Sequence, residues 1–491
     1  MKKAGYLFCK VSVAFLLILI FNSTPAKCQF YMWNPQKALT DSAADNINPT
    51  IAFYYGSDNL EHSILFWERS TDLTSTSIWY KCLDGGNPQE PTELIASPGV
   101  HFTNPKVVVL SNSIPAADSS FMLFFESDVN GDKDLYSMKY YNNGSFTAPQ
   151  LFSGLPGDDK NLTLVWGYSI FAVWENQGRI LKSDWDYMQN SFSAPEIMST
   201  EGSHDPTGSE MNIYWIKDTL SGSKVVYLKR EYISGNWIYT GPYDLENEGT
   251  NSNLEACKGF FMFGSQDYTV WQNTQSLSPT QIRFAFNNSP IHEVLDLGSP
   301  NFNYSSPDVM DFPMIIKMPT FLAFVTDSLG NDEVMVNSGY SFGLDNPTNL
   351  SNYEGPDRNP QFFGTVSAYI FQANLLWESL RDGHWTIFYS HYDMTIGLQN
   401  DLSGKSLEIS PNPSSEVSHI SLPANSRGSL NIYNSFQILV KSIRIPGNGI
   451  EAIKEIGWDG MDDQGNKVPA GAYIIRYVSD NGAVSAKLIR Y

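Results

Sequence analysis

Short apolar runs separated by turn residues dominate the chain between residues 29 and 400. Runs of about four to eight residues, rich in aromatic and β-branched side chains, alternate with clusters of glycine, proline, asparagine, aspartate and serine. Aromatic and β-branched side chains suit the pleated surface of a strand. No segment of this region has convincing amphipathic-helix spacing. The pattern predicts an all-β protein.

Two markers show that these runs repeat. The first is a polar residue followed by proline at the start of a short strand, found at Asn48-Pro49, Asn104-Pro105, Asp205-Pro206, Ser306-Pro307 and Asn359-Pro360. Two more units lack the proline and begin near Lys160-Asn161 and Asn251-Ser252. The second marker is an apolar strand ending in an aromatic residue and a glutamate, as in Leu65–Glu68, Leu123–Glu126, Ala172–Glu175 and Leu375–Glu378. A third strand and a proline-containing fourth strand follow.

Seven units of four strands, each of about 40 to 58 residues, are typical of a β-propeller. Six or eight blades stay open as alternatives. The last unit ends after its third strand, and the segment Trp33–Leu39 has the pattern of a fourth strand. We therefore expect a propeller over residues 29–394, closed by an N-terminal strand within 31–39 so that no sheet edge stays open.

The first 28 residues have the form of a secretory signal peptide. Lys2, Lys3 and Lys10 supply positive charge, residues 11–21 are apolar, and Ala26-Lys27-Cys28 precedes the expected cleavage before Gln29. A lipoprotein cleaved at Cys28 is the alternative, against which Lys27 argues. The apolar run is too short to span a bilayer comfortably, so we expect no membrane span in the mature chain.

The negative charge of the chain lies in one region. The net charge is −21, and residues 401–491 carry nine acidic and nine basic side chains, so removal of the lysine-rich signal leaves an excess of −25 within residues 29–400. Such a surface repels nucleic acid, which we exclude as a partner, and anionic membrane. The two cysteines left, Cys82 and Cys257, fall in different repeats, which predicts two separate buried thiols rather than a disulfide.

The last part of the chain, residues 407–491, carries motifs of a different kind. It reads LEISPNPSS from Leu407, then Trp458-Asp459-Gly460, then Val468-Pro469-Ala470-Gly471, and ends in a short strand. These elements resemble the type A C-terminal sorting domain of Bacteroidota proteins exported by the type IX secretion system. The resemblance implies a partner, the type IX secretion machinery, a secreted or outer-cell-surface location, and removal of the tail after export.

Within this tail we expect short strands in a small immunoglobulin-like β-sandwich, joined to the propeller by a linker at 395–406. The segment Asp462–Gly465 is interpreted as a tight hairpin turn.

Candidate binding residues lie in loops that would meet at one mouth of a propeller channel. These loops lead into the first strand of each unit, and their chemistry-bearing residues include His101, His204, Asp205, Asp357 and Arg358. The alternative is that aspartate and asparagine fill these loops because turns require them. The recurrent glutamates Glu68, Glu126, Glu175 and Glu378 are interpreted as bonding the backbone or neighbouring blades, since catalytic acids have no reason to repeat.

A calcium ion is the only cofactor that the sequence offers. Asp128, Asn130, Asp132 and Asp134 space four oxygen-bearing side chains two residues apart, which can wrap a calcium ion. The pattern resembles the calcium loops of integrin-type propellers, but Lys133 stands where those loops favour glycine. A plain solvated hairpin is the alternative.

The segment from Trp377 to Ile387 resembles the blade signature of TolB-type and sialidase-like propellers. A sialidase needs three convergent arginines, whereas the arginines of residues 29–400 are scattered over five units. The sequence also lacks a G-x-S-x-G motif, a P-loop and a dinucleotide fingerprint.

We therefore expect a glycan- or protein-binding module. The alternatives are a polysaccharide-acting glycosidase or lyase with its site at the channel mouth, and a structural matrix component. Whether the chain is an enzyme stays open at this point.

Overall fold

The computed structural model describes Trp33 to Tyr491 apart from residues 56–60, 71–73, 85–88, 111–118, 142, 166–169, 211, 234–235, 262–263, 277, 287–301, 311–319, 340–346, 367–369, 396–406, 423–427, 434–438, 446–454, 463–464, 470 and 480–481. The expected signal peptide and all but the first residue of the expected linker lie outside the described residues. The chain divides into two units, one formed by Trp33–Asp393 and the other containing the residues from Met394 to Tyr491. The described residues include no helix that could span a membrane.

The described residues of Trp33–Asp393 form seven separate antiparallel sheets, numbered here in chain order. The first contains β2 (Asp45–Tyr55), β3 (Glu61–Ser70), β4 (Ser77–Cys82) and β5 (Thr92–Ile95). The second contains β6 (Phe102–Val109), β7 (Ser119–Ser127), β8 (Asp134–Tyr141) and β9 (Gln150–Ser153). The third contains β10 (Asp159–Val165), β11 (Phe171–Asn176), β12 (Arg179–Asp186), β13 (Ser191–Phe192) and β14 (Glu196–Ile197). The fourth contains β15 (Ser203–Gly208), β16 (Asn212–Thr219), β17 (Gly222–Ile233) and β18 (Asn236–Glu246).

The remaining three sheets follow the same meander. The fifth contains β19 (Thr250–Phe261), β20 (Gly264–Thr274) and β21 (Gln281–Phe286). The sixth contains β22 (Tyr304–Met310), β23 (Thr320–Thr326), β24 (Glu333–Gly339) and β25 (Thr348–Asn349). The seventh contains β26 (Asp357–Val366), β27 (Ile370–Arg381) and β28 (His384–Thr395), and its fourth strand is β1 (Lys37–Ala38) from the start of the unit.

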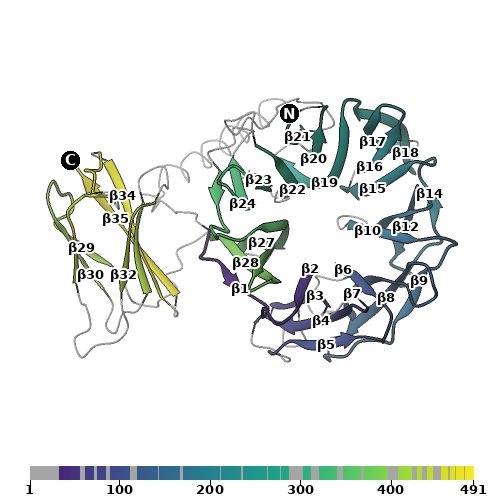
Figure 1. Cartoon of the computed structure of the whole chain (residues 1–491), viewed down its shortest axis with the longest axis horizontal. Coiled ribbons are helices and arrows are strands. Elements are labelled where there is room, and N and C mark those ends of the chain that lie inside the picture. The colour runs from purple at the N-terminus through teal and green to yellow at the C-terminus, as the bar shows by residue number, and fades with distance from the viewer. Residues whose placement is uncertain are drawn as a thin grey trace, which may run out of the picture. The chain divides into compact units, whose positions relative to one another are not determined.

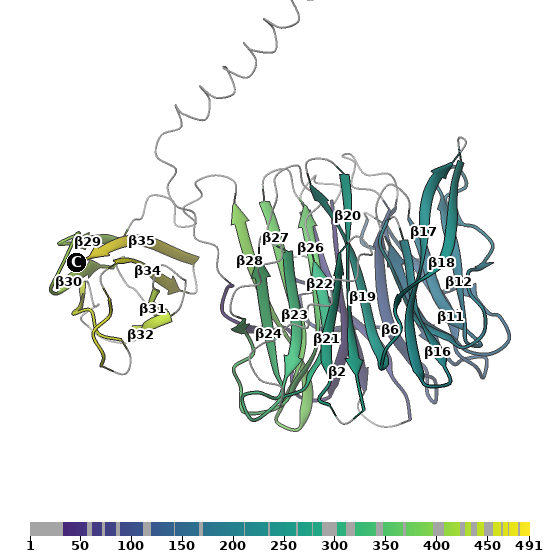
Figure 2. The same cartoon turned by 90° about the horizontal axis from the view of Figure 1, so that it is seen from above.

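The seven sheets follow one another around a ring, with the first strand of each nearest the centre (Figure 1). Each first strand contacts the first strand of the next sheet, and β2 also contacts β26. Figure 2 shows the strands of this unit side by side along one common direction. The all-β, propeller-like repeat predicted from the sequence is thus present.

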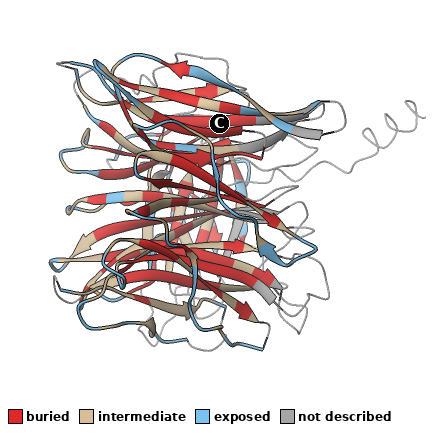
Figure 3. Ribbon diagram, turned by 90° about the vertical axis from the view of Figure 1, so that its right-hand side faces the viewer, coloured by how far each residue is buried: buried red, intermediate tan, exposed pale blue. Residues whose placement is uncertain are grey.

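Apolar layers lie between consecutive sheets and hold them together. One layer joins the first and second sheets through Phe66 and Phe121, and another joins the seventh and first through Leu376 and Trp67. The second strand of each sheet is buried almost throughout because it has a neighbouring sheet on both faces (Figure 3). This sandwiching explains why the second strands are continuously apolar rather than alternating.

The two cysteines, Cys82 and Cys257, form no disulfide. Both are half-buried rather than fully buried, which corrects the sequence expectation in part. They lie in the first and fifth sheets, each at the margin of an apolar layer.

The second unit contains two antiparallel sheets. One has the order β29 (Glu408–Ser410), β30 (Ser418–Ser421), β33 (Glu455–Trp458), and the other has β32 (Leu439–Ile445), β31 (Gly428–Tyr433), β34 (Gly471–Ser479), β35 (Gly482–Arg490). Apolar side chains of both sheets, among them Ile420, Trp458, Leu430 and Leu488, form one core. The expected turn at Asp462–Gly465 is confirmed, because Gly465 N–H donates to the Asp462 carbonyl and Met461 pairs with Lys467.

Candidate functional site

Each of the seven first strands carries one polar residue in the left-handed backbone region, here called the bulge residue. Its φ lies between 46° and 54°, and the strand register shifts around it. Asparagine and aspartate tolerate this region better than most residues. The seven bulge residues are Asn48, Asn104, Asn161, Asp205, Asn253, Ser306 and Asn359. The polar–proline marker of the sequence is therefore the bulge residue and the proline after it.

The recurrent glutamates link neighbouring sheets through these bulge residues. Glu68 Oε1 accepts the Asn104 N–H of the next sheet at 2.5 Å and the Asn48 Nδ2 of its own sheet at 2.6 Å. Glu126 repeats this arrangement one sheet further on, and Glu378 accepts the Asn48 N–H at 2.8 Å, so the seventh sheet is linked to the first. The prediction that these glutamates bond neighbouring units is confirmed for Glu68, Glu126 and Glu378. Glu175 instead bonds within its own sheet, to Asn161 and Lys160. Burial raises the pKa of Glu68 to about 7.

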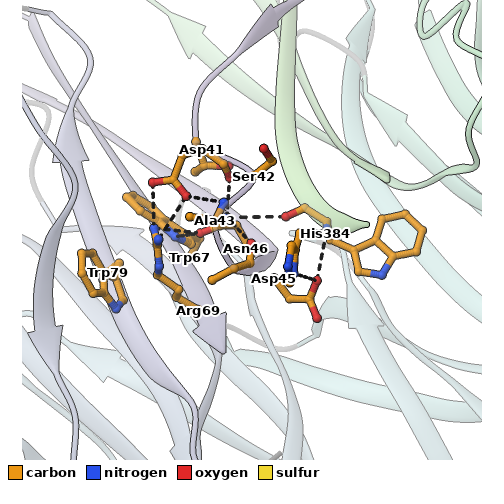
Figure 4. A network of polar contacts seen from close by, with 12 residues as sticks. Asp41, Ser42, Ala43, Asp45, Asn46, Trp67, Arg69, Trp79 and His384 are labelled. Carbon is orange, nitrogen blue, oxygen red and sulfur yellow. Dashed lines mark hydrogen bonds and ion pairs between the residues drawn. The ribbon is translucent and has the colours of Figure 1, made fainter. Parts of the chain in front are cut away.

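In the first and third sheets, the buried polar side chain two residues before the bulge residue accepts a hydrogen bond from a tryptophan. Trp67 Nε1 donates to Asn46 Oδ1 at 2.8 Å, which Figure 4 shows beside the Asp41–Arg69 ion pair. Trp174 Nε1 donates to Asp159 Oδ1 at 3.0 Å in the third sheet. Asp357 occupies the same position in the seventh sheet and is fully buried, which raises its pKa to about 6. Unlike Asn46 and Asp159, Asp357 accepts no hydrogen bond from the tryptophan of its sheet, Trp377.

Two residues after the bulge, seven polar side chains form a ring that lines a central cavity of about 570 Å³. The first strands of all seven sheets contribute to this cavity. The ring residues, in sheet order, are Thr50, Lys106, Thr163, Thr207, Glu255, Asp308 and Gln361. Charge is therefore confined to three of seven equivalent positions.

Aromatic side chains complete the wall of the central cavity. Phe53 and Tyr54 come from the first sheet and Phe362 and Phe363 from the seventh. A cavity that combines aromatic walls with a few convergent polar groups has the ordinary composition of a small-molecule site, and about 300 to 1,000 Å³ is the usual range for such sites.

The two acids of the ring lie on adjacent sheets and repel each other. Asp308 accepts the Val309 N–H at 2.7 Å and the Phe362 N–H at 2.5 Å, so its carboxylate is held in place. Thr207 Oγ1 donates to Glu255 at 3.4 Å. Burial and then the charge of Glu255 raise the pKa of Asp308 to about 8, and burial likewise raises the pKa of Glu255. The Lys106 charge opposes both shifts, which places it within electrostatic reach of the pair.

His204 and Asp205, predicted at a channel mouth, lie together in a second hollow of about 330 Å³, here called the rim pocket. His204 Nδ1 lies 3.4 Å from Asp205 Oδ2, and its Nε2 lies 3.2 Å from Asp218 Oδ1. The hydrogen bond to Asp205 raises the pKa of His204. Lys160 and Glu175 of the third sheet complete the charged lining.

The other predicted mouth residues belong to different sheets. His101 precedes the second sheet, and its N–H donates to Asp128 Oδ1 at 2.7 Å. Arg358 is in the seventh sheet, where its Nε donates to Glu378 at 2.7 Å and its guanidinium stacks 3.7 Å from the Trp385 ring centroid. Of the five residues predicted at the channel mouth, His204 and Asp205 alone line one of the pockets found among the described residues, the rim pocket.

The side chains of the predicted calcium loop point to separate partners. Asp128 accepts the His101 N–H, and Asp132 accepts the Gly157 N–H at 3.0 Å. Asn130 donates its Nδ2 to Asp134 at 2.8 Å. Within the described residues no group of three or more histidine, cysteine or acidic side chains is placed to hold a metal. Calcium binding stays a prediction.

In the second unit, the motifs of the tail meet around the last strand. The Arg490 guanidinium is buried, donates to the carbonyls of Glu416 and Asp459, and lies 5.0 Å from the Trp458 ring centroid. Asn412 of the SPNP motif accepts the Ile489 N–H at 2.9 Å. Val468 N–H donates to the Gly460 carbonyl at 2.9 Å, so all three motifs belong to one cluster.

Sequence reasoning missed the charged ring residues Lys106, Glu255 and Asp308. A signal was present, because a polar residue directly follows the marker proline in all five units that have one. The pattern says nothing of where such a side chain points, and only the bulge turns it toward the cavity.

No protein-family model matches the chain, and no curated protein matches it either. Among solved structures, the chain is similar to AofleA from Arthrobotrys oligospora, with 9% identity, a TM-score of 0.32, and coverage of 74% of this chain and 91% of that one. It is similar to a post-proline cleaving enzyme from Rickettsia typhi at 10% identity and a TM-score of 0.36, with coverage of 74% and 57%. The WD40 domain of Toxoplasma gondii coronin gives 9% identity, a TM-score of 0.39, and coverage of 73% and 90%. Likeness at this level identifies no family.

Proposed function

We propose that the chain is a secreted or surface-attached seven-bladed β-propeller that binds a small glycan in its central cavity. In this proposal the type IX secretion machinery exports the protein by recognising an immunoglobulin-like sandwich at 407–491. The observation that carries the binding function is the central cavity itself. Every blade contributes one polar ring side chain to it, and aromatic side chains flank the ring.

The blade count rests on three repeats that agree. The described residues of Trp33–Asp393 form seven sheets with seven bulge residues and seven ring positions. The contact between β2 and β26 and the Asn48–Glu378 hydrogen bond close the circle. The fourth strand supplied by β1 joins the start of the unit to its last sheet.

A sugar matches the chemistry of the central cavity. Its hydroxyls pair with hydroxyl, amide and carboxylate groups such as Thr163 and Gln361, and its apolar face stacks on aromatic rings such as Phe362. The recurrent glutamates that could have served as acid and base are engaged in bonds between or within blades. Binding therefore accounts for the geometry better than the channel-mouth chemistry expected from the sequence.

One observation favours a second function, hydrolysis of a glycan. Glu255 and Asp308 are paired carboxylates in a cavity, and the pKa of Asp308, raised to about 8, keeps a proton available at neutral pH, as a general acid requires. The backbone bonds that hold Asp308 are a structural reason for the same residue, so this is the second candidate.

Export is supported by the tail. Its sorting-domain motifs form one cluster around Arg490 rather than three separate surface features. Expression in a bacterium with type IX secretion, with and without residues 407–491, tests this proposal. Extracellular protein in both cases would refute it.

A panel of soluble oligosaccharides tests the binding function on the purified protein, with retained and released saccharide read by mass spectrometry. Gln361→Met in the cavity removes the amide assigned to a sugar hydroxyl and should weaken retention at least fivefold, whereas Lys160→Met on the rim is the control and should not. Released fragments would establish the hydrolase instead. Retention that responds to Lys160→Met alone would move the site to the rim pocket, and no retention of any saccharide would refute glycan binding.

A further inference from the structure

The charges in the central cavity are not required by the fold. The ring position is equivalent in all seven sheets, and threonine occupies it in three of them. Thr163 shows what the position does structurally, because its Oγ1 donates to the Pro206 carbonyl of the next sheet at 2.9 Å. A neutral hydroxyl is therefore sufficient for contact between neighbouring sheets, so this contact does not by itself require the charges of Glu255 and Asp308.

We propose that the ligand of the central cavity carries a protonated amine, and that Glu255 and Asp308 bind this group between them. The inference rests on the proposed glycan-binding function and specifies its substrate class, an amino sugar with a free amine.

The two carboxylates offer complementary properties for such a group. Asp308 is fixed by two backbone N–H donors, and each of its oxygens retains a lone pair for the ligand. Glu255 has one hydrogen bond from the described residues, a long one from Thr207, so it can turn toward a bound cation at little cost. Together they supply one rigid and one adaptable acceptor on adjacent sheets.

The aromatic side chains of the central cavity also favour a protonated amine. Phe362 follows directly after the ring residue Gln361, and its backbone contacts Asp308. Cations bind to the faces of aromatic rings. A neutral ligand would use the rings for stacking alone and would leave the two acids on adjacent sheets without a cation between them.

Electrostatics give the reason why a cation would be selected. The charged groups that act on the pair are Lys106, across the cavity, and Asp205, from the fourth sheet. Mutual repulsion and burial disfavour two adjacent negative charges. A bound ammonium removes this repulsion, and a ligand without one does not.

Calorimetric titration of the whole protein tests the inference with two matched saccharides, the glucosamine trimer and the N-acetylglucosamine trimer. They share a backbone and differ in the free amine. We expect the amine form to bind at least tenfold more tightly. Glu255→Gln should remove this preference, so that the two trimers bind with the same affinity. The rim variant Asp218→Asn is the control and should keep the preference.

Asp308→Asn is a weaker test because its backbone bonds could be lost, so Glu255→Gln decides the outcome. Equal affinity for both trimers, or a preference that survives Glu255→Gln, overturns the inference while glycan binding stands. The tripeptide Gly-Lys-Gly separates the sources of the amine. If it binds and neither saccharide does, the amine site is supported and the glycan function fails. If none of the three binds, both fail.

Discussion

Replacement of Glu126 by alanine is the sharpest test of how the sheets are held together. Its Oε1 accepts the Asn161 N–H of the next sheet and the Asn104 Nδ2, both at 2.9 Å, and its Oε2 lies 2.9 Å from Lys133 Nζ. The side chain is 4% exposed. Alanine would leave the Asn161 N–H and the Asn104 Nδ2 without their acceptor, which costs about 1 to 3 kcal/mol for each donor. Lys133 is 41% exposed and can be hydrated, so the lost ion pair adds under about 1 kcal/mol.

Urea unfolding followed by tryptophan fluorescence measures this loss. With a slope of about 3 kcal/mol per molar urea, the midpoint should fall by roughly 1 to 1.5 M. Glu126→Gln keeps the Oε1 acceptor and loses only the charge opposite the partly exposed Lys133, so a loss under about 1 kcal/mol is expected.

Glu201→Ala is the matched control. Glu201 pairs with Arg179 at 2.6 Å, but its side chain is 75% exposed, and exposed pairs contribute under about 1 kcal/mol. The reasoning is refuted if Glu126→Ala lowers the midpoint by no more than Glu201→Ala does.

Three further predictions concern pH, the tail and the N-terminal strand. Because the folded-state pKa values of Glu68 and Asp308 are raised to about 7 and about 8, the folded protein retains protons that the unfolded chain releases above about pH 4. The urea midpoint should therefore fall from pH 5 to pH 8, and a rise over that range would contradict the assignment. Gly460 has a φ of +79°, and in Gly460→Ala the new Cβ would lie 2.2 Å from the buried Arg490 guanidinium. Gly465 has a similar φ of +82°, but the Cβ of Gly465→Ala would lie in open space. Hydrogen exchange of the tail should therefore increase far more in Gly460→Ala than in Gly465→Ala. Deletion of residues 33–39 removes β1 and should lower the melting temperature of the propeller measured by calorimetry, and an unchanged melting temperature would show that β1 contributes nothing.

Several features of the fold were predictable because they follow from local pattern and repetition. The polar–proline marker located five of the seven first strands, and Glu68, Glu126 and Glu378 were interpreted correctly because a residue that repeats in several units serves the repeat. Trp33–Leu39 could be matched to a fourth strand because the last unit visibly lacked one.

The candidate site was predictable only in part. His204 and Asp205 lie together in the rim pocket because they are neighbours in sequence, and Asp218 joins them from the next strand. Asp357 and His101 occur in similar loops, but they lie at different sheets and line none of the pockets described above, so shared loop type does not bring side chains together. The direction of a loop side chain depends on which strand packs behind it.

The sequence by itself determined the all-β character, the repeat, the strand order within each unit and the motifs of the tail, since each of these is a pattern along the chain. Only the tertiary structure decided that Lys106, Glu255 and Asp308 share one cavity. These residues are more than 50 positions apart from one another in the sequence. They share the cavity because the left-handed bulge turns the side chain two positions later toward the centre of the ring of sheets. That ring exists only once the sheets have packed against one another.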